Sequence, residues 1–207
     1  LIPLNTSRSD STLFTEKPDL VSFVHQEDDY NDFGLEPLLP HRFSREGPYI
    51  TTGDVNNDGL EDFFVGGSSG HPGVFFVQQR NGRFRQKTLK TPAEKPEEDT
   101  GCLLFDADGD QDLDLYVASG GNQFERNSPF YQDRLYLNDS KGNFTLAVHA
   151  LPKMFTPSSC VTAADFDRDG DLDVFVGGRR EILKYGASGM SYLLANDGKG
   201  RFTDVTE

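Results

Sequence analysis

Tryptophan is absent from this chain of 207 residues, and only four histidines and two cysteines are present. The histidines are widely separated, and none has a metal-ligand spacing such as HExxH: His25, His41, His71 and His149. The chain has no GxSxG nucleophile motif, and the GKG at 198–200 lacks the following Ser or Thr of a phosphate loop. These absences disfavour the common hydrolases and nucleotide-binding enzymes, and we expect no catalytic residue.

Long apolar runs and basic clusters are also missing. No stretch of 18 apolar residues occurs, so no membrane-spanning helix is predicted. The 20 basic residues are outnumbered by 34 acidic ones, for a net charge of −14. Nucleic acids and anionic membranes bind clustered Lys and Arg, so neither is an expected partner. The chain starts at Leu without a signal peptide, which we interpret as a mature or excised piece of a longer protein.

The two cysteines, Cys102 and Cys160, precede acidic segments by four and five residues. Because these offsets differ by one, the two side chains would point to opposite faces of paired strands. We therefore expect free, buried thiols. A disulfide in an oxidising compartment remains the alternative.

Acidic residues are concentrated in three nearly identical segments. They read DVNNDGLED at 54–62, DADGDQDLD at 106–114 and DFDRDGDLD at 165–173, and they hold four, five and five of the acidic residues. Each segment has Asp at positions 1, 5 and 9, and Asn or Asp at position 3. Carboxylates this crowded repel one another unless a hard cation lies between them, and Ca²⁺ takes about six to eight oxygen ligands. The segments therefore predict three calcium loops, with metal-free acidic turns as the alternative.

In such a loop, positions 1, 3, 5 and 9 supply side-chain oxygens and position 7 supplies a backbone carbonyl. The first site would use Asp54, Asn56, Asp58, the carbonyl of Leu60 and Asp62. The second site would use Asp106, Asp108, Asp110, the carbonyl of Asp112 and Asp114. The third site would use Asp165, Asp167, Asp169, the carbonyl of Asp171 and Asp173.

Position 6 of a calcium loop turns sharply and favours glycine, which Gly59 and Gly170 provide. The second loop has Gln111 there, and a left-handed conformation costs a non-glycine residue about 1 kcal/mol. We therefore expect the second site to be the weakest. An EF-hand is disfavoured because position 12 is valine rather than glutamate in all three segments, inside apolar β-rich runs.

The acidic segments recur after 52 and then 59 residues, which indicates a repeat architecture. In each repeat a short strand precedes the loop, an apolar strand follows it, and two more strands are joined by an Asn/Gly turn. Four strands in about 50 to 60 residues match one blade of a β-propeller. We predict an all-β propeller fold with repeats at about 48–100, 101–157 and 158–207, each with its calcium loop between the first and second strands.

The remaining segments interrupt or precede this pattern. Residues 1–47 are predicted to form a lead-in, with a polar linker over 1–13, an outer strand over 13–25 and an irregular part. Inserts are expected at 90–100, as an exposed loop, and at 122–133 and 179–190. Long loops are where repeat proteins usually bind partners. In the second insert, Phe124, Phe130 and Tyr131 are a candidate contact patch.

The repeats resemble a known family. DVNNDGLEDFFVGG, DADGDQDLDLYVASGG and DFDRDGDLDVFVGG are similar to FG-GAP/VCBS repeats, the calcium-loop blades of propellers like those of integrin α-subunits, over about 48–207. FVHQEDDYNDFGLEPLLPHRFSREGP resembles the lead-in of large bacterial proteins, especially of Bacteroidetes, that join such repeats to an ASPIC/UnbV module. The resemblance implies a seven-bladed propeller, of which about three blades are present here, with Ca²⁺ in the blade loops and an extracytoplasmic location.

We therefore expect a non-catalytic, calcium-stabilised module with about three Ca²⁺ ions that binds or scaffolds a protein or glycan partner through its loop face. It would act outside the cytoplasm of a bacterium, as a secreted, periplasmic or outer-membrane surface protein without direct membrane insertion. One alternative is a calcium-dependent, lyase-like carbohydrate-active enzyme, for which Lys184 and Tyr185 are scattered candidates. Another is an accessory subunit of an outer-membrane complex.

Overall fold

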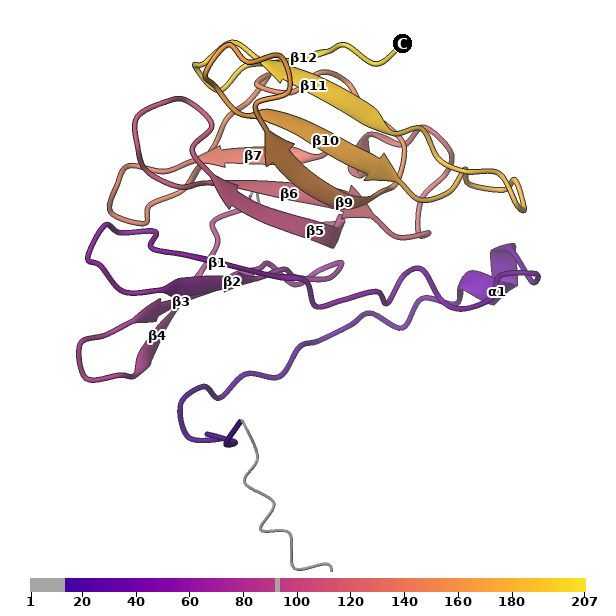
Figure 1. Ribbon diagram of the computed structural model, residues 1–207. Helices are drawn as coiled ribbons and strands as arrows, with labels where there is room; N and C mark the ends of the chain where they lie inside the picture. The colour runs from indigo at the N-terminus through magenta and orange to yellow at the C-terminus, as the bar shows by residue number, and fades with distance from the viewer. Residues whose placement is uncertain (1–13, 92–93) are drawn as a thin grey trace, which may run out of the picture.

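The computed structural model describes residues 14–91 and 94–207. Within these residues, twelve strands form three four-stranded antiparallel sheets (Figure 1). Each sheet comes from one continuous stretch of chain, and the sheets follow one another in sequence. The predicted all-β class, with one four-stranded unit for each acidic loop, is confirmed.

The strands lie where apolar, β-branched and aromatic residues alternate with Gly- and Asn-rich turns. The first sheet contains β1 (Ile50–Gly53), β2 (Asp62–Val65), β3 (Val74–Gln78) and β4 (Phe84–Thr88). The middle sheet contains β5 (Glu98–Phe105), β6 (Asp114–Gly120), β7 (Arg134–Leu137) and β8 (Thr145–Leu146). The third sheet contains β9 (Ser158–Ala164), β10 (Asp173–Gly178), β11 (Tyr192–Asn196) and β12 (Phe202–Asp204). In every sheet, consecutive strands are neighbours.

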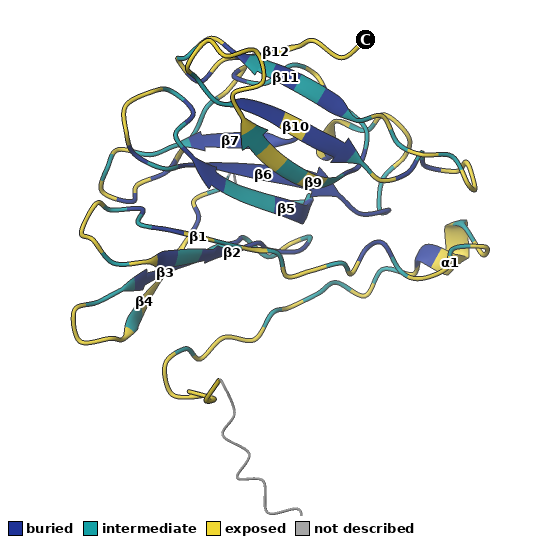
Figure 2. Ribbon diagram, viewed as in Figure 1, coloured by how far each residue is buried: buried dark blue, intermediate teal, exposed yellow. Residues whose placement is uncertain are grey.

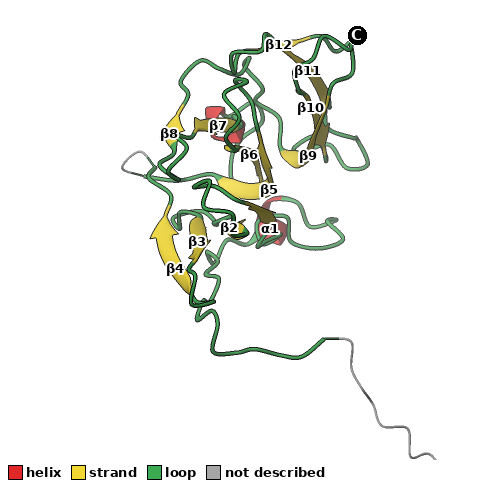
Figure 3. Cartoon of the chain, turned by 60° about the vertical axis from the view of Figure 1, so that its left-hand side comes forward, coloured by secondary structure: helices red, strands yellow, loops and turns green. Residues whose placement is uncertain are grey.

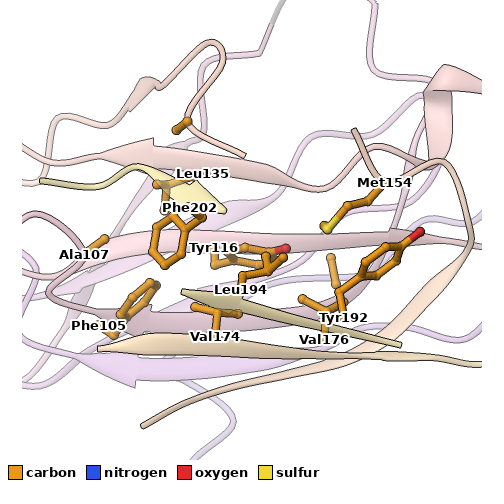
Figure 4. Close-up of a cluster of buried hydrophobic side chains, with 12 residues drawn as sticks. Phe105, Ala107, Tyr116, Leu135, Met154, Val174, Val176, Tyr192, Leu194 and Phe202 are labelled. Atoms are coloured by element: carbon orange, nitrogen blue, oxygen red, sulfur yellow. The ribbon is translucent and has the colours of Figure 1, made fainter. Parts of the chain in front are cut away.

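The middle sheet is covered on both faces. Every residue of β6 is buried, and alternate side chains of β6 enter different cores. Leu115 and Val117 pack with residues of the first sheet such as Phe64. Tyr116 packs instead with Val174 and other residues of the third sheet (Figure 4). Both faces of β6 are apolar because each face packs against a different neighbouring sheet. Such a strand is typical of a sheet packed between two others.

The sheets stack through their first strands. β5 contacts both β1 and β9, whereas the fourth strands β4 and β8 lie on the side away from β5 and β9 (Figure 3). This is the arrangement of successive propeller blades around an inner edge. The three described sheets do not close into a ring, and the third sheet keeps an open face on which Phe175 is 44% exposed. Figure 2 shows the contrast between the buried middle sheet and the partly exposed β9 and β10.

Both cysteines are free, as predicted, and Cys102 is half-buried. Burial raises the pKa of the Cys102 thiol well above its usual value, with a further contribution from Asp99. Cys160 lies on the first strand of the third sheet and is exposed, so the expectation of burial is wrong for this residue.

The lead-in forms no strand between residues 14 and 49, so the expected outer strand is wrong over the described residues 14–25. Pro18 has no N–H to donate, and the chain turns there through a bond from Leu20 N–H to the Lys17 carbonyl. The segment instead covers the first sheet with a side chain, because the Phe23 ring lies edge-on to Phe76 at a centroid distance of 5.4 Å. The short helix α1 (Asp32–Leu35) follows. The expected polar linker at 1–13 lies outside the described residues.

The two ends of the sheets differ because antiparallel strands place successive connections at opposite ends. The acidic loops join first to second strands, so they lie at one end, which we call the loop end. The inserts at 122–133 and 179–190 join second to third strands and lie at the opposite end, which we call the insert end. The lead-in also reaches the insert end, where the Ser68 hydroxyl donates to the Gln26 carbonyl.

The insert at 90–100 differs from its prediction as an exposed loop. β5 already begins at Glu98, and Lys95 is buried. The Lys95 ammonium donates to the Ser68 carbonyl at 2.9 Å and pairs with Asp99 at 3.1 Å. Residues 92 and 93 of this insert lie outside the described residues.

Candidate metal-binding loops

The position-9 aspartates of the three loops are buried at the start of the second strand of each sheet. In the middle sheet, Asp114 is 1% exposed and accepts hydrogen bonds from the N–H of Ala107 and of Asn138, both at 2.9 Å. Asp62 and Asp173 accept the two equivalent bonds in their own sheets. This carboxylate therefore ties the start of each loop to the end of the third strand.

The position-1 aspartates accept hydrogen bonds from backbone N–H groups later in the same loop. Asp106 accepts from the N–H of Gly109 at 2.8 Å and of Gln111 at 3.0 Å. In the first loop, Asp54 accepts from the N–H of Gly59 at 2.7 Å. In all three loops the position-5 carboxylate accepts from the N–H at position 7. These bonds leave carboxylate lone pairs free, so the same side chains retain the capacity to bind a cation.

Each loop has left-handed backbone at position 4 as well as at position 6. The sequence analysis predicts this conformation only at position 6. Glycine occupies one of the two positions in every loop. The other is taken by Asn57 (φ 56°), Gln111 (φ 71°) and Arg168 (φ 68°). Asparagine tolerates this conformation, whereas glutamine and arginine do so less readily. Backbone strain therefore does not single out the second loop, because the third loop carries an equivalent residue.

The second and third loops bring three carboxylates together. Asp106, Asp108 and Asp114 each place one oxygen so that all three oxygens lie within 4.8 Å of one another. The third loop does the same with its residues at positions 1, 3 and 9: Asp165, Asp167 and Asp173. The position-5 residues are outside these two groups. Among the described residues the first loop forms no such group of acids, because its position 3 is Asn56.

The electrostatics of the second loop fit a hard cation. The pKa of Asp114 is raised to about 7, chiefly by burial and also by the nearby charges of Asp108 and Asp112, although the hydrogen bonds from the N–H of Asn138 and Ala107 lower it. One buried oxygen of Asp108 and one of Asp112 have no hydrogen-bond partner. Buried oxygens without a donor and carboxylates that repel one another are both stabilised by a cation. The residues present therefore suit Ca²⁺, which prefers several oxygen ligands.

Two asparagines link the loop of one sheet to the loop of the preceding one. The Asn138 side chain donates to the Val55 carbonyl of the first loop at 2.9 Å and to the Leu113 carbonyl of its own loop at 3.2 Å. Asn196 repeats this with the carbonyls of Ala107, at 2.8 Å, and Leu172, at 3.1 Å. The sequence analysis predicted only an Asn/Gly turn at this place in the repeat and no contact between loops. An Asn at the end of the third strand in two repeats was the signal for this contact.

These repeats identify the family. The FG-GAP-like repeat family matches residues 54–117 and 106–176, more than half of the chain. The chain belongs to the FG-GAP-like repeat family. Each match starts at the first aspartate of an acidic loop and ends in the strand that follows the next loop. No curated protein matches the chain.

FG-GAP-like repeats are typical of extracellular domains and of β-propeller-type modules, and the three antiparallel sheets agree with propeller blades. In the described part of the chain, no helix has the length and apolarity needed to cross a membrane. The family match includes all three acidic loops but neither the lead-in nor the 179–190 insert.

The expected contact patch in the second insert is only partly exposed. Tyr131 is fully buried, and its hydroxyl donates to the Phe124 carbonyl at 2.9 Å. Phe130 is exposed and packs against the Phe124 ring at 4.7 Å between centroids. Tyr131 is therefore a core residue of the insert, and its buried hydroxyl is hydrogen-bonded within the insert.

Proposed function

We propose that this chain is a non-catalytic, calcium-stabilised β-propeller module that acts outside the cytoplasm and binds or scaffolds a protein or glycan partner. The observation that carries the proposal is the recurrence of one carboxylate arrangement in three loops, with two groups of three carboxylates gathered within 4.8 Å. A bacterial parent protein with seven blades and an ASPIC/UnbV module is part of the same proposal.

The ions would be held by the residues of positions 1, 3, 5 and 9, together with the position-7 carbonyls. Bound Ca²⁺ would supply the positive charge that these carboxylates lack, and about three ions would offset six of the negative charges. The stabilisation follows from mass action, at about 2.7 kcal/mol for one site at a hundredfold excess over Kd. Calcium concentrations outside cells suit weak sites of this kind.

Two observations support a non-catalytic role over the alternative of a carbohydrate-active enzyme. Lys184 is in an ion pair with Glu181 at 2.8 Å, and Tyr185 is exposed on a surface turn. The carboxylates of the acidic loops are engaged with their own backbone and are the expected ion ligands. An accessory role in an outer-membrane complex stays a proposal that co-purification with a large partner would test.

The metal sites are tested by thermal unfolding in EDTA and after addition of Ca²⁺ or Mg²⁺. We expect Ca²⁺ alone to raise the midpoint strongly, and we expect the substitutions Asp58→Ala, Asp110→Ala and Asp169→Ala each to reduce that rise. Asp139→Ala is the matched control, because Asp139 is an exposed aspartate in a turn outside the loops and should leave the calcium response unchanged. If calcium does not change the midpoint of the unaltered protein, the acidic segments are solvated turns.

A further inference from the structure

The 179–190 insert at the insert end carries three exposed apolar side chains. It joins β10 to β11 and lies beside α1 in Figure 1. Leu183, Tyr185 and Met190 are 58%, 73% and 59% exposed. A single exposed apolar residue needs no explanation, but a group of them in one loop is typical of an interaction surface.

This insert is held in place by buried contacts with other segments. The Arg180 side chain is buried, forms an ion pair with Glu36 next to α1, and donates to the Asn122 carbonyl oxygen Oδ1 at 2.7 Å. Glu36 also accepts from the N–H of Leu183 at 3.1 Å. Leu183 has left-handed backbone with φ of 60°, a conformation that is unfavourable for leucine and is found where surrounding contacts impose it. The apolar residues are therefore presented on a fixed loop.

Basic groups outnumber acidic ones around this insert, although the whole chain has a net charge of −14. Glu181 is shared by Arg126 and Lys184. Glu46 is shared by Arg179, at 2.8 Å, and the His41 ring, at 2.9 Å. Two carboxylates thus serve three permanent cations and one histidine, which leaves a local positive charge that favours an anionic ligand.

Two hollows are lined in part by the 179–190 insert, and we call this insert the ridge. One hollow of about 450 Å³ is lined by residues that include Phe43, Lys184 and Tyr185. The other, of about 500 Å³, is lined by residues that include Arg126 and Met190. Both hollows border Ser188 near the end of the insert, so one elongated ligand could contact the ridge and both hollows.

We propose that this ridge, residues 179–190 with its two hollows, is the partner-binding surface and that its partner is an acidic polypeptide segment with apolar side chains. Tyr, Met and Arg are enriched in protein interfaces, and the surplus of basic groups complements acidic residues. This inference rests on the proposed role as a binding module, and it moves the partner from the loop end to the insert end.

A random peptide library displayed on phage tests the proposal with the calcium-loaded full chain as bait. We expect the selected peptides to be rich in Asp and Glu and to carry large apolar residues. Fluorescence anisotropy of one selected peptide should show about tenfold or greater weakening by Tyr185→Ala combined with Lys184→Glu, and a loss of affinity at high salt. Ile50→Ala combined with Lys199→Glu is the matched control, since both residues are exposed and lie outside the ridge.

The inference is overturned if selected peptides bind the ridge variant as tightly as the unaltered protein, or if they show no excess of acidic residues. Binding of a polyuronate such as polygalacturonate, lost in the ridge variant while no peptide is selected, would also overturn it in favour of a glycan partner. The calcium-dependent unfolding midpoint, measured on the same variant, shows that the sheets are intact. If the unaltered protein selects no peptide although its calcium response is intact, this inference is contradicted and the proposed metal sites still stand.

Discussion

The loop end and the insert end of the three sheets are built in opposite ways. At the loop end the same hydrogen bonds recur in every sheet, as the position-9 aspartates show. At the insert end the buried contacts occur once each. Examples are the pair of Arg180 with Glu36 and the pair of Arg134 with Asp99 at 2.6 Å. Contacts that recur in every sheet indicate that each blade needs them to fold. Contacts that occur once are specific to one blade, so the insert end can differ from blade to blade.

The strongest test of this difference separates backbone support from metal binding at the loop end. Asp114→Ala leaves the N–H groups of Ala107 and Asn138 buried and unpaired, and we expect the free energy of unfolding to fall by about 3 kcal/mol or more even in EDTA. Asp110→Ala removes a carboxylate that accepts only one local hydrogen bond. We therefore expect it to lower the free energy of unfolding mainly when calcium is present. Chemical unfolding of both variants, with and without calcium, measures this. Equal losses in EDTA would contradict the distinction.

At the insert end we expect a dependence on pH that comes from Glu98. Its side chain is fully buried, with one oxygen accepting from Ser69 N–H at 3.0 Å and the other without a partner. Burial raises its pKa from 4.5 to about 8, assisted by the charge of Glu27 and opposed by that of Lys95. The folded state thus binds the proton more tightly than the unfolded state. The resulting stability is fully present below pH 4.5 and is lost as the pH rises through about 8.

Glu98→Gln removes this titration. In saturating calcium, the free energy of unfolding of the unaltered protein should fall relative to the variant between pH 5 and 8, by up to about 1.4 kcal/mol for each pH unit. The comparison of the two proteins cancels the titration of the loop carboxylates, which both share. Parallel pH profiles would show that Glu98 does not titrate in this range.

The connection between neighbouring sheets at the loop end should have an intermediate effect. Asn138→Ala and Asn196→Ala each remove a side chain that bridges two loops, and we expect a loss of about 1–2 kcal/mol in urea unfolding. Gln78 occupies the equivalent position at the end of β3, as its N–H bond to Asp62 shows. No preceding sheet is available for it to bridge among the described residues, so Gln78→Ala should change stability by less than about 0.5 kcal/mol. A similar loss at Gln78 would argue against the bridging role.

The smallest expected effects concern backbone strain within the loops. Gln111→Gly and Arg168→Gly place glycine at left-handed positions and should raise the unfolding free energy by up to about 1 kcal/mol in calcium. Asn57→Gly should change it less, because asparagine already tolerates this conformation. A gain at Gln111 but none at Arg168 would support the prediction that the second loop is the weakest.

Much of the fold could be predicted because its signals are local. The strands follow short apolar segments bounded by Gly and Asn, and the acidic loops follow a fixed spacing of aspartates. The outer strand over 13–25 was wrong because a strand needs a partner, and the described residues of that segment pair with none. The position of the inserts opposite the metal loops follows from strand order, whereas the end at which a partner binds stays a prediction. The bound calcium stays a prediction.

The sequence by itself determined the three loops, the order of the strands and the two apolar faces of β6, because these depend on residues close together in the chain. Only the tertiary structure decided that Asn138 reaches Val55, 83 residues away, and that Arg180 pairs with Glu36 across 144 residues. Such contacts require the relative placement of sheets and lead-in, which arises from packing of the whole chain and which no local spacing encodes.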